Sequence, residues 1–288
     1  MIKAESLRHG GVIANYICNA ACRHCLYACS PTRTDGYISS ETARALCSML
    51  LKGGCRSLHI GGGEPFLDVD GLITLARCVM EAGIALEYVE TNAFWSENER
   101  AMEIIDRCLQ AGITTFCISL DQFHAEYIQQ DRPIKLAELC KRMGMGFFLW
   151  RTQSLTYGGR AVNIEMESSS LRPAEELVSN RPCRRLTSGD HFHVDLYGHF
   201  IPPGCTGFAL PLDEVIAGLT PGRYPVLEVL YKTGTKGLLR FAIDHGFKPD
   251  PVGYSSACAL CFFIRYWLTE NAPYPELYRE HYKASLEY

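Results

Sequence analysis

The sequence predicts an α/β protein with a parallel sheet, because short apolar runs alternate with amphipathic segments of helical periodicity through its first half. A sheet of this kind is either doubly wound or curled into a full or partial barrel. In each case the loops that follow the strands meet at one end of the sheet, where function is concentrated. Most of the unusual polar residues of the first half stand in such loops, which supports this layout.

The predicted strands are apolar runs bounded by turn residues, at residues 12–16, 57–60, 86–90, 115–120 and 147–151. The predicted helices lie between them, at residues 39–51, 71–82, 96–112 and 123–142. Ser39 or Ser40 can cap the first helix, because a serine hydroxyl accepts hydrogen bonds from the free amides of a first turn. Ser96 with Glu99 forms a capping box for the third helix. Pro133 predicts an interruption in the fourth.

The composition is that of an ordinary globular protein, with 47% hydrophobic and 21% charged residues in a chain of 288. No apolar segment is long enough to span a bilayer and the N-terminus has no signal-peptide core, so we expect a cytoplasmic protein without membrane contact. A net charge of −4 without a basic stripe argues against a nucleic-acid partner. The 14 cysteines lack a secretion signal and include metal-like spacings, which favours metal or redox chemistry over disulfides.

The first chemical motif directly follows the first predicted strand. Cys18, Cys22 and Cys25 stand at C-x3-C-x2-C spacing. Three thiolates at this spacing can bind three corners of a [4Fe-4S] cluster and leave one iron open to another ligand. A structural zinc knuckle with Cys29 as the fourth ligand is the alternative.

The second motif follows the second predicted strand, where Gly61, Gly62 and Gly63 precede Glu64 and Pro65. Glycines let a backbone lie directly against a ligand, and a glutamate offers a carboxylate to a cation. Taken alone, this stretch is equally typical of a simple turn between a strand and a helix.

Together the two motifs resemble those of the radical S-adenosylmethionine (SAM) enzymes, over roughly residues 10–165. The resemblance implies a partial (β/α)6 barrel. It also implies that Cys18, Cys22 and Cys25 bind a [4Fe-4S] cluster whose open iron takes the amino and carboxylate groups of SAM. An electron from the reduced cluster then cleaves SAM, and the resulting 5'-deoxyadenosyl radical takes a hydrogen atom from the substrate. Reduced flavodoxin or ferredoxin is the expected electron donor.

Further positions match the family's SAM contacts. Gly62, Gly63 and Glu64 match the motif that receives the methionine amino group, and His24 stands where an aromatic residue often passes near the adenine. The remaining matches are Ser119 of an S-x-D element, Asn92 of a T-N-G-like element in which Ala93 replaces the glycine, and Arg151, which either pairs with the SAM carboxylate or is an ordinary surface arginine. The candidates for a general base are Glu90, Asp121, His124 and Arg151, of which His124 is the first choice.

The second half carries another metal-type pattern around a predicted hairpin at residues 191–202. Four cysteines at C-x21-C-x52-C-x2-C spacing flank it, namely Cys183, Cys205, Cys258 and Cys261. Zinc fits four thiolates well. With the first half, however, the pattern resembles the Twitch or short SPASM-type extension of radical SAM enzymes, which implies an auxiliary [4Fe-4S] cluster. The hairpin histidines, His191, His193 and His199, are ligands in principle but are more typical of plain strand positions.

The expected domain organisation follows from these motifs. Residues 1–170 form the SAM-binding barrel, residues 180–265 the auxiliary-cluster domain and residues 266–288 a closing helix, with a polar linker-like stretch at residues 165–180. Helices are expected at residues 173–178, 212–217, 224–231, 235–245, 262–270 and 275–288.

The leading functional hypothesis is a radical SAM enzyme that oxidises, or forms a bond in, a small molecule or a peptide side chain, with the auxiliary cluster accepting an electron. A ribosomal-peptide maturase or epimerase is the alternative, with Cys29 as hydrogen-atom donor, although a cysteine in such a loop is more often an inert thiol. Only 17 residues precede Cys18, which weakens leader-dependent peptide maturation. A non-catalytic zinc-binding interaction protein represents a different class.

Overall fold

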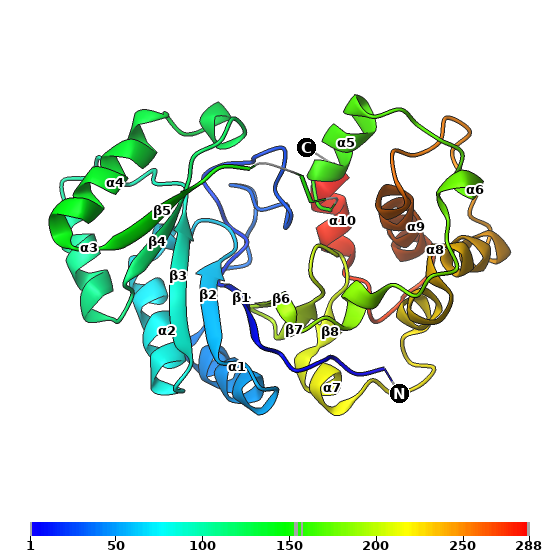
Figure 1. The fold of residues 1–288 in the computed structure, drawn as a ribbon, viewed down its shortest axis with the longest axis horizontal. Coiled ribbons are helices and arrows are strands. Elements are labelled where there is room, and N and C mark those ends of the chain that lie inside the picture. The colour runs from blue at the N-terminus through cyan, green and yellow to red at the C-terminus, as the bar shows by residue number, and fades with distance from the viewer. Residues whose placement is uncertain (1, 153–154, 157, 287–288) are drawn as a thin grey trace.

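The computed structural model describes residues 2–152, 155–156 and 158–286. In this part of the chain one sheet of eight strands has the order β5-β4-β3-β2-β1-β6-β7-β8 (Figure 1). The first six strands pair in parallel, and these are β1 (His9–Ile13), β2 (Ser57–Gly61), β3 (Ala85–Thr91), β4 (Thr115–Ser119), β5 (Gly146–Trp150) and β6 (Asp190–Asp195). The predicted partial (β/α)6 barrel is therefore confirmed.

Four long helices alternate with the strands and cover the outer face of the sheet (Figure 1). They are α1 (Ser40–Lys52), α2 (Val69–Glu81), α3 (Ala101–Gln110) and α4 (Asp131–Met143). The predicted cap of α1 is present, because the Ser39 hydroxyl accepts a hydrogen bond of 3.1 Å from the Thr42 amide. The core lies between these helices and the sheet, where residues such as Leu46, Ile60 and Phe116 are fully or almost fully buried.

The predicted start of the third helix is wrong. The third helix begins at Ala101, and Ser96 is buried before it in a turn in which its amide donates to Ala93 O. The capping box with Glu99 is therefore not used. The predicted interruption before Pro133 is confirmed, because α4 begins only at Asp131 and Pro133 lies in its first turn, where the missing N–H costs no hydrogen bond. The residues before it form only the short 3-10 turn η2 (His124–Glu126).

The hairpin of the second half is confirmed, but its first strand continues the main sheet. β6 pairs antiparallel with β7 (His199–Ile201), which in turn pairs with β8 (Leu210–Pro211). On its other edge β6 pairs in parallel with β1. Sequence reasoning placed this hairpin in a separate unit, whereas hydrogen bonding makes β6 the sixth strand of the barrel. The residue boundaries of the proposed domains stay predictions.

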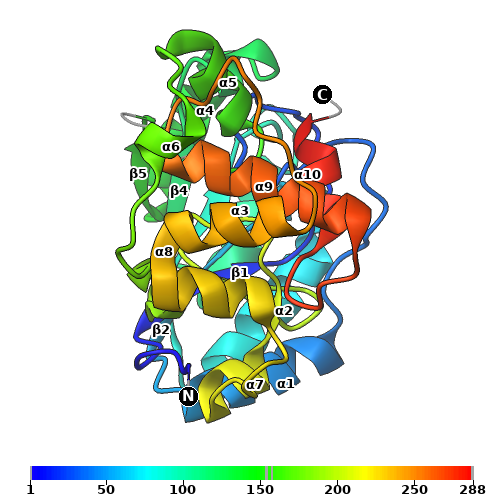
Figure 2. The ribbon, with the colours of Figure 1, turned by 90° about the vertical axis from the view of Figure 1, so that its right-hand side faces the viewer.

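Most helices of the second half pack together on the other side of the hairpin, whereas α7 packs against α1, β7 and β8 (Figures 1 and 2). They are α5 (Ala161–Ser168), α6 (Ala174–Leu177), α7 (Leu212–Ala217), α8 (Pro225–Asp244), α9 (Ala257–Asn271) and α10 (Arg279–Leu286), with the 3-10 turn η3 (Arg184–Thr187). Gly234, at φ 65° and ψ −161°, divides α8 into the two helical segments that were predicted. α5 occupies part of the stretch that was expected to be a linker. α9 begins before the predicted residue 262 and so carries Cys258 and Cys261.

Among the described residues, none of the helices combines the length and the apolar character that crossing a bilayer requires.

Candidate active site

The carboxyl ends of the parallel strands surround a cavity of about 560 Å³. Most of the predicted site residues line it, namely Cys18, Cys22, His24, Cys25, Cys29, Gly62, Gly63, Glu64, Asn92, Ser119 and His124. Arg151 does not line the cavity and is exposed just beyond β5. Side chains from loops that are far apart in the sequence therefore meet at the carboxyl ends of the parallel strands, as expected for this type of sheet.

The two sequence motifs are hydrogen-bonded to each other at one wall of this cavity. The amides of Gly63 and Glu64 donate to the carbonyl oxygens of Asn15 and Ile17, each at 2.9 Å. A side chain at position 63 would place its Cβ 1.9 Å from Ile17 O, so only glycine permits this approach. The glycine-rich turn therefore packs first against the segment that leads into Cys18, which sequence reasoning did not anticipate.

Glu64 is buried beneath this wall, and its carboxylate accepts three hydrogen bonds from the protein. The donors are the Asn92 amide at 2.7 Å, the Thr91 hydroxyl at 2.9 Å and the Phe66 amide at 3.2 Å. Burial raises the pKa of Glu64 to about 7, although these hydrogen bonds act in the opposite direction. The first role of Glu64 is thus to fix the loop after β3, while it remains part of the cavity wall.

Asn92 carries this connection on to the cysteine loop. Its side-chain amide donates to Asn19 Oδ1 at 2.8 Å and lies 3.9 Å from Cys18 Sγ. The neighbouring Ala93 adopts φ 65°, the left-handed conformation that glycine supplies in the T-N-G pattern. Ala93 therefore adopts the backbone conformation that a glycine would have at this position of the pattern.

The three cysteines of the loop suit a positively charged cluster. All three are free thiols, and burial raises the pKa of Cys18 to about 12 and that of Cys22 further. A buried thiolate needs a nearby cation, which an iron–sulfur cluster supplies. Backbone amides already point at two of the sulfurs, since Ala20 N lies 3.4 Å from Cys18 Sγ and Cys29 N lies 3.4 Å from Cys25 Sγ.

Cys29 contacts the loop as a hydrogen-bond donor. Its thiol donates to the sulfur of Cys25, which lowers the pKa of Cys25 and raises that of Cys29. Cys29 is buried and lines the cavity beside the three proposed ligands.

Arg160, which sequence reasoning missed, clamps the cysteine loop from the start of α5. Its Nε donates to Cys22 O at 2.9 Å and its Nη2 to Cys29 O at 2.7 Å, while its amide donates to Cys25 O at 3.0 Å. The preceding Gly159 has φ 54°, and a Cβ there would lie 2.2 Å from Leu26 O. In the sequence, the only signal for Arg160 is the pair of glycines that precedes it, and this pattern is typical of a boundary between domains.

A second wall is formed by His24 and the loop after β4, with Phe123 buried behind the His24 ring. The His24 and Phe123 rings stack with their centroids 4.6 Å apart, and burial lowers the pKa of His24. Asp121 accepts hydrogen bonds from His124 Nδ1 at 3.0 Å and from the Thr152 hydroxyl at 2.8 Å. Burial opposes ionisation of Asp121, but these hydrogen bonds outweigh it and hold its pKa below the usual range.

Asp121 therefore orients the side chain of His124, which lines the cavity. The ligand atoms of His24, His124 and Cys22 lie within 4.8 Å of one another. The side chain chosen first as a general base thus stands directly beside the cysteine loop. Ser119, at the end of β4, is half-buried and lines the same cavity.

The four cysteines of the second half are also brought together, from the turn before η3, the turn after β7 and the first turn of α9. Burial, together with the proximity of the other three cysteines, raises the pKa of Cys205 to about 12, although Arg265 acts in the opposite direction. In the described part of the chain, no three of these sulfurs lie within 4.8 Å of one another.

Arg265 and Tyr282 support this second group of cysteines from α9 and α10. Arg265 is buried and donates to Cys261 O at 3.3 Å, to Thr206 O at 2.9 Å and to the Tyr282 hydroxyl at 2.7 Å. A guanidinium beside cysteine sulfurs favours their charged form.

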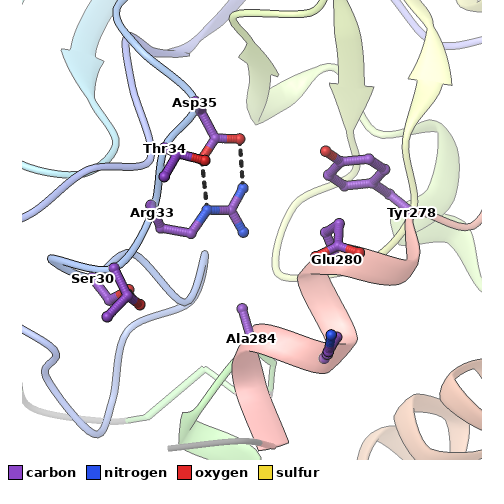
Figure 3. A pocket seen from close by; sticks show the side chains of 9 residues that line it. Ser30, Arg33, Thr34, Asp35, Tyr278, Glu280 and Ala284 are labelled. Atoms are coloured by element: carbon purple, nitrogen blue, oxygen red, sulfur yellow. Dashed lines mark hydrogen bonds and ion pairs between the residues drawn. The ribbon is translucent and has the colours of Figure 1, made fainter.

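The C-terminal helix α10 is attached to the first half through a buried network. His281 Nε2 lies 2.8 Å from the Tyr16 hydroxyl, which donates to Asp195 Oδ2 at 3.0 Å. Beside this network, residues of α10 and the segment after Cys29 line a pocket of about 580 Å³ (Figure 3). Arg33 and Asp35 form an ion pair within this pocket, and the Tyr197 hydroxyl donates to Asp35 at 2.7 Å.

Comparison with known proteins gives matches to the sequence and to the fold. The profile of the Radical SAM superfamily matches residues 12–168, more than half of the chain. YydG of Bacillus subtilis (strain 168), a protein assigned to peptide biosynthesis, is 27% identical over 114 residues, which are 39% of this chain and 35% of YydG. The chain therefore spans about a third of that relative's length.

Among solved structures, BtrN in complex with AdoMet and 2-DOIA aligns with a TM-score of 0.53 at 15% identity. The alignment covers 82% of this chain and 91% of BtrN. At this identity the likeness supports the fold, and it extends across both halves of the chain.

Proposed function

Because the chain belongs to the radical SAM superfamily, we propose that it is an enzyme that cleaves SAM reductively and abstracts a hydrogen atom from an organic substrate. Cys18, Cys22 and Cys25 would hold the [4Fe-4S] cluster, and the cavity that they line would receive SAM. When bound, this cofactor pair supplies the electron and the 5'-deoxyadenosyl radical that abstracts the hydrogen atom. The observation that carries the proposal is the wall in which the glycine-rich turn and the cysteine loop are hydrogen-bonded to each other.

The chain's own residues would position the reactants and exclude water. Glu64 and Asn92 tie the loops of β2 and β3 to the sulfur of Cys18. Arg160 fixes the carbonyl groups of the cysteine loop from the opposite side. The His24 ring, stacked on the buried Phe123, offers the cavity an aromatic surface suited to the adenine. His124, oriented by Asp121, would accept a proton at Nε2 if the reaction releases one.

We propose a second [4Fe-4S] cluster on Cys183, Cys205, Cys258 and Cys261, which would take up the second electron of an oxidation. The grouping of the four cysteines beside Arg265 supports this assignment. Reduced flavodoxin or ferredoxin would supply the first electron.

A peptide is the substrate class we favour, because the curated relative YydG is assigned to peptide biosynthesis. A natural-product-type small molecule is the alternative. Epimerisation is a second candidate reaction, because Cys29 lines the same cavity and its thiol could return a hydrogen atom to a substrate radical. In D2O an epimerisation would place one solvent deuterium in the product, whereas an oxidation would place none.

Iron analysis and SAM cleavage test the proposed function. Anaerobically purified protein should be brown and contain about eight iron and eight sulfide per chain, as two cubane clusters require. With SAM and dithionite it should form 5'-deoxyadenosine. Cys22→Ala should abolish this product, while Cys108→Ala, a buried cysteine of α3, should leave it unchanged. A colourless protein that holds zinc would show a zinc-binding interaction protein instead, and iron-loaded protein that forms no 5'-deoxyadenosine would refute the catalytic assignment.

A further inference from the structure

We infer that one wall of the cavity is a subsite for a cationic group of the substrate, an ammonium or a guanidinium. The inference rests on the proposed function and adds the chemical class of the substrate. Glu90 on β3, His193 on β6, Tyr27 and Tyr88 line this wall, and His59 on β2 is buried behind them. We refer to these five residues as the Glu90 subsite.

The backbone around the Glu90 subsite makes room for its side chains. A Cβ at Gly61 would lie 2.3 Å from Glu90 Oε2, and a Cβ at Gly11 would lie 2.3 Å from His59 Nε2. Two strand positions therefore carry glycine where a side chain would exclude these polar groups from the interior. Glycine weakens a strand, so its use here matches a need for space inside the barrel.

The polar groups of the subsite touch one another across three strands. His59 Nε2 lies 3.1 Å from His193 Nε2 and 3.9 Å from Glu90 Oε1. The His59 ring stacks on Tyr88 with the centroids 4.8 Å apart, and Tyr27 lies 5.2 Å from the His193 ring. These aromatic contacts hold the imidazoles against the wall and leave the carboxylate facing the cavity.

The Glu90 carboxylate has no cationic partner in the described part of the chain. Its side chain is 42% exposed, and no described residue donates a hydrogen bond to it. The imidazoles beside it stay neutral, because burial lowers the pKa of His59 to about 3 and that of His193 well below its usual value. The other titratable groups that face this region are Tyr27, Tyr88, Cys25, Cys117, His124 and His191.

A cation is the ligand that best complements this arrangement. A carboxylate on a wall with neutral imidazoles and tyrosine rings attracts an ammonium or guanidinium through charge and through the ring faces. A divalent metal ion fits less well, because Glu90, His59 and His193 do not bring three ligand atoms within 4.8 Å of one another in the described residues. SAM is separate, since its proposed contacts are with the cysteine loop, Glu64 and Asn92.

Binding of paired probes tests the subsite in the iron-loaded protein at saturating SAM. The probes are N-acetyl-lysine methylamide and N-acetyl-arginine methylamide, each compared with N-acetyl-norleucine methylamide, which lacks the charge. The cationic probes should bind at least tenfold more tightly than norleucine, as measured by calorimetry or saturation-transfer NMR. Glu90→Gln should remove this preference and leave norleucine affinity unchanged, whereas Glu90→Asp should retain part of it.

Glu81→Gln removes the same charge at an exposed position of α2 and should keep the full preference. Equal affinity of all probes for the unmodified protein, or a preference that survives Glu90→Gln, would overturn the inference. So would one zinc or manganese ion per chain that Glu90→Gln removes, because the carboxylate would then belong to a metal site. 5'-Deoxyadenosine formation in the same preparations separates the two proposals: its presence without a cation preference refutes only the subsite, and its absence refutes the enzyme assignment.

Discussion

The guanidinium Nε of Arg160 donates a 2.9 Å hydrogen bond to the carbonyl oxygen of Cys22, across 138 residues of sequence. Together with the bond from Nη2 to Cys29 O, it fastens the cysteine loop to the first residue before α5. The conformation of the cysteine loop thus depends on the positively charged side chain of Arg160, which is almost fully buried. Hydrogen bonds from a charged donor in such a place contribute more than those at a surface.

Replacing Arg160 by methionine should destabilise the protein and loosen its iron. The variant keeps the length of the side chain but leaves the buried Cys29 carbonyl oxygen without a donor and removes one of the two donors of Cys22 O, which keeps the Cys25 amide. We expect this to cost about 2–5 kcal/mol. We expect a lower urea midpoint and iron loss at the three-cysteine loop. Arg77→Met, at an exposed position of α2, is the matched control and should melt like the unmodified protein. Unchanged stability and iron content in Arg160→Met would contradict this role.

Replacing both Cys258 and Cys261 by alanine should halve the iron. If these residues hold the auxiliary cluster, iron should fall from about eight to about four per chain while SAM cleavage persists. Iron assays and 5'-deoxyadenosine assays on the same sample check both parts. Cys108→Ala should keep all the iron. Loss of all iron in the double variant would mean that the two cysteine groups do not hold separate clusters.

Replacing Cys29 by alanine should lower the reduction potential of the SAM-binding cluster. The Cys29 thiol donates to the sulfur of Cys25, and a hydrogen bond to a ligand sulfur stabilises the more negative, reduced cluster. Redox titration followed by electron paramagnetic resonance measures the potential, with Cys108→Ala as the control. A potential that stays the same would show that Cys29 does not interact with the cluster.

Replacing Glu90 by glutamine should stabilise the protein above neutral pH. Burial raises the pKa of Glu90 to about 7 from an ordinary value near 4.5. A carboxyl group whose pKa is raised in the folded state favours folding most at low pH, and this contribution is lost as the pH rises through the folded pKa. The variant's melting temperature should therefore exceed that of the unmodified protein at pH 8, with a smaller difference at pH 6. A pH-independent difference would count against a raised pKa of Glu90 in the folded protein.

Local patterns were sufficient to predict the alternating strands and helices and the two motifs at the strand ends. Apolar periodicity and capping serines act over a few residues, so the bounds of β2 and α1 are close to those predicted. The capping box at Ser96 is wrong because Trp95 and Ala93 pack that segment into a buried turn. α5 was taken for a linker because a short helix with polar residues has little apolar pattern of its own.

The contacts that complete the candidate site could not be predicted in the same way. β6 was placed in a separate hairpin because pairing with β1 leaves no trace in its own sequence. The same holds for the 3.1 Å contact between His59 and His193, which are 134 residues apart. Each histidine alone looks like an ordinary strand residue.

From the sequence alone we could determine the superfamily, the cysteines proposed as ligands and the (β/α) architecture, because each depends on residue types at short, regular spacings. Only the tertiary structure decided that Glu64 fixes Asn92, that Arg160 clamps the cysteine loop and that Glu90 faces the cavity beside two neutral imidazoles. These relationships arise where distant strands and helices converge. Their physical basis, burial and a hydrogen-bond partner, exists only once the chain has folded.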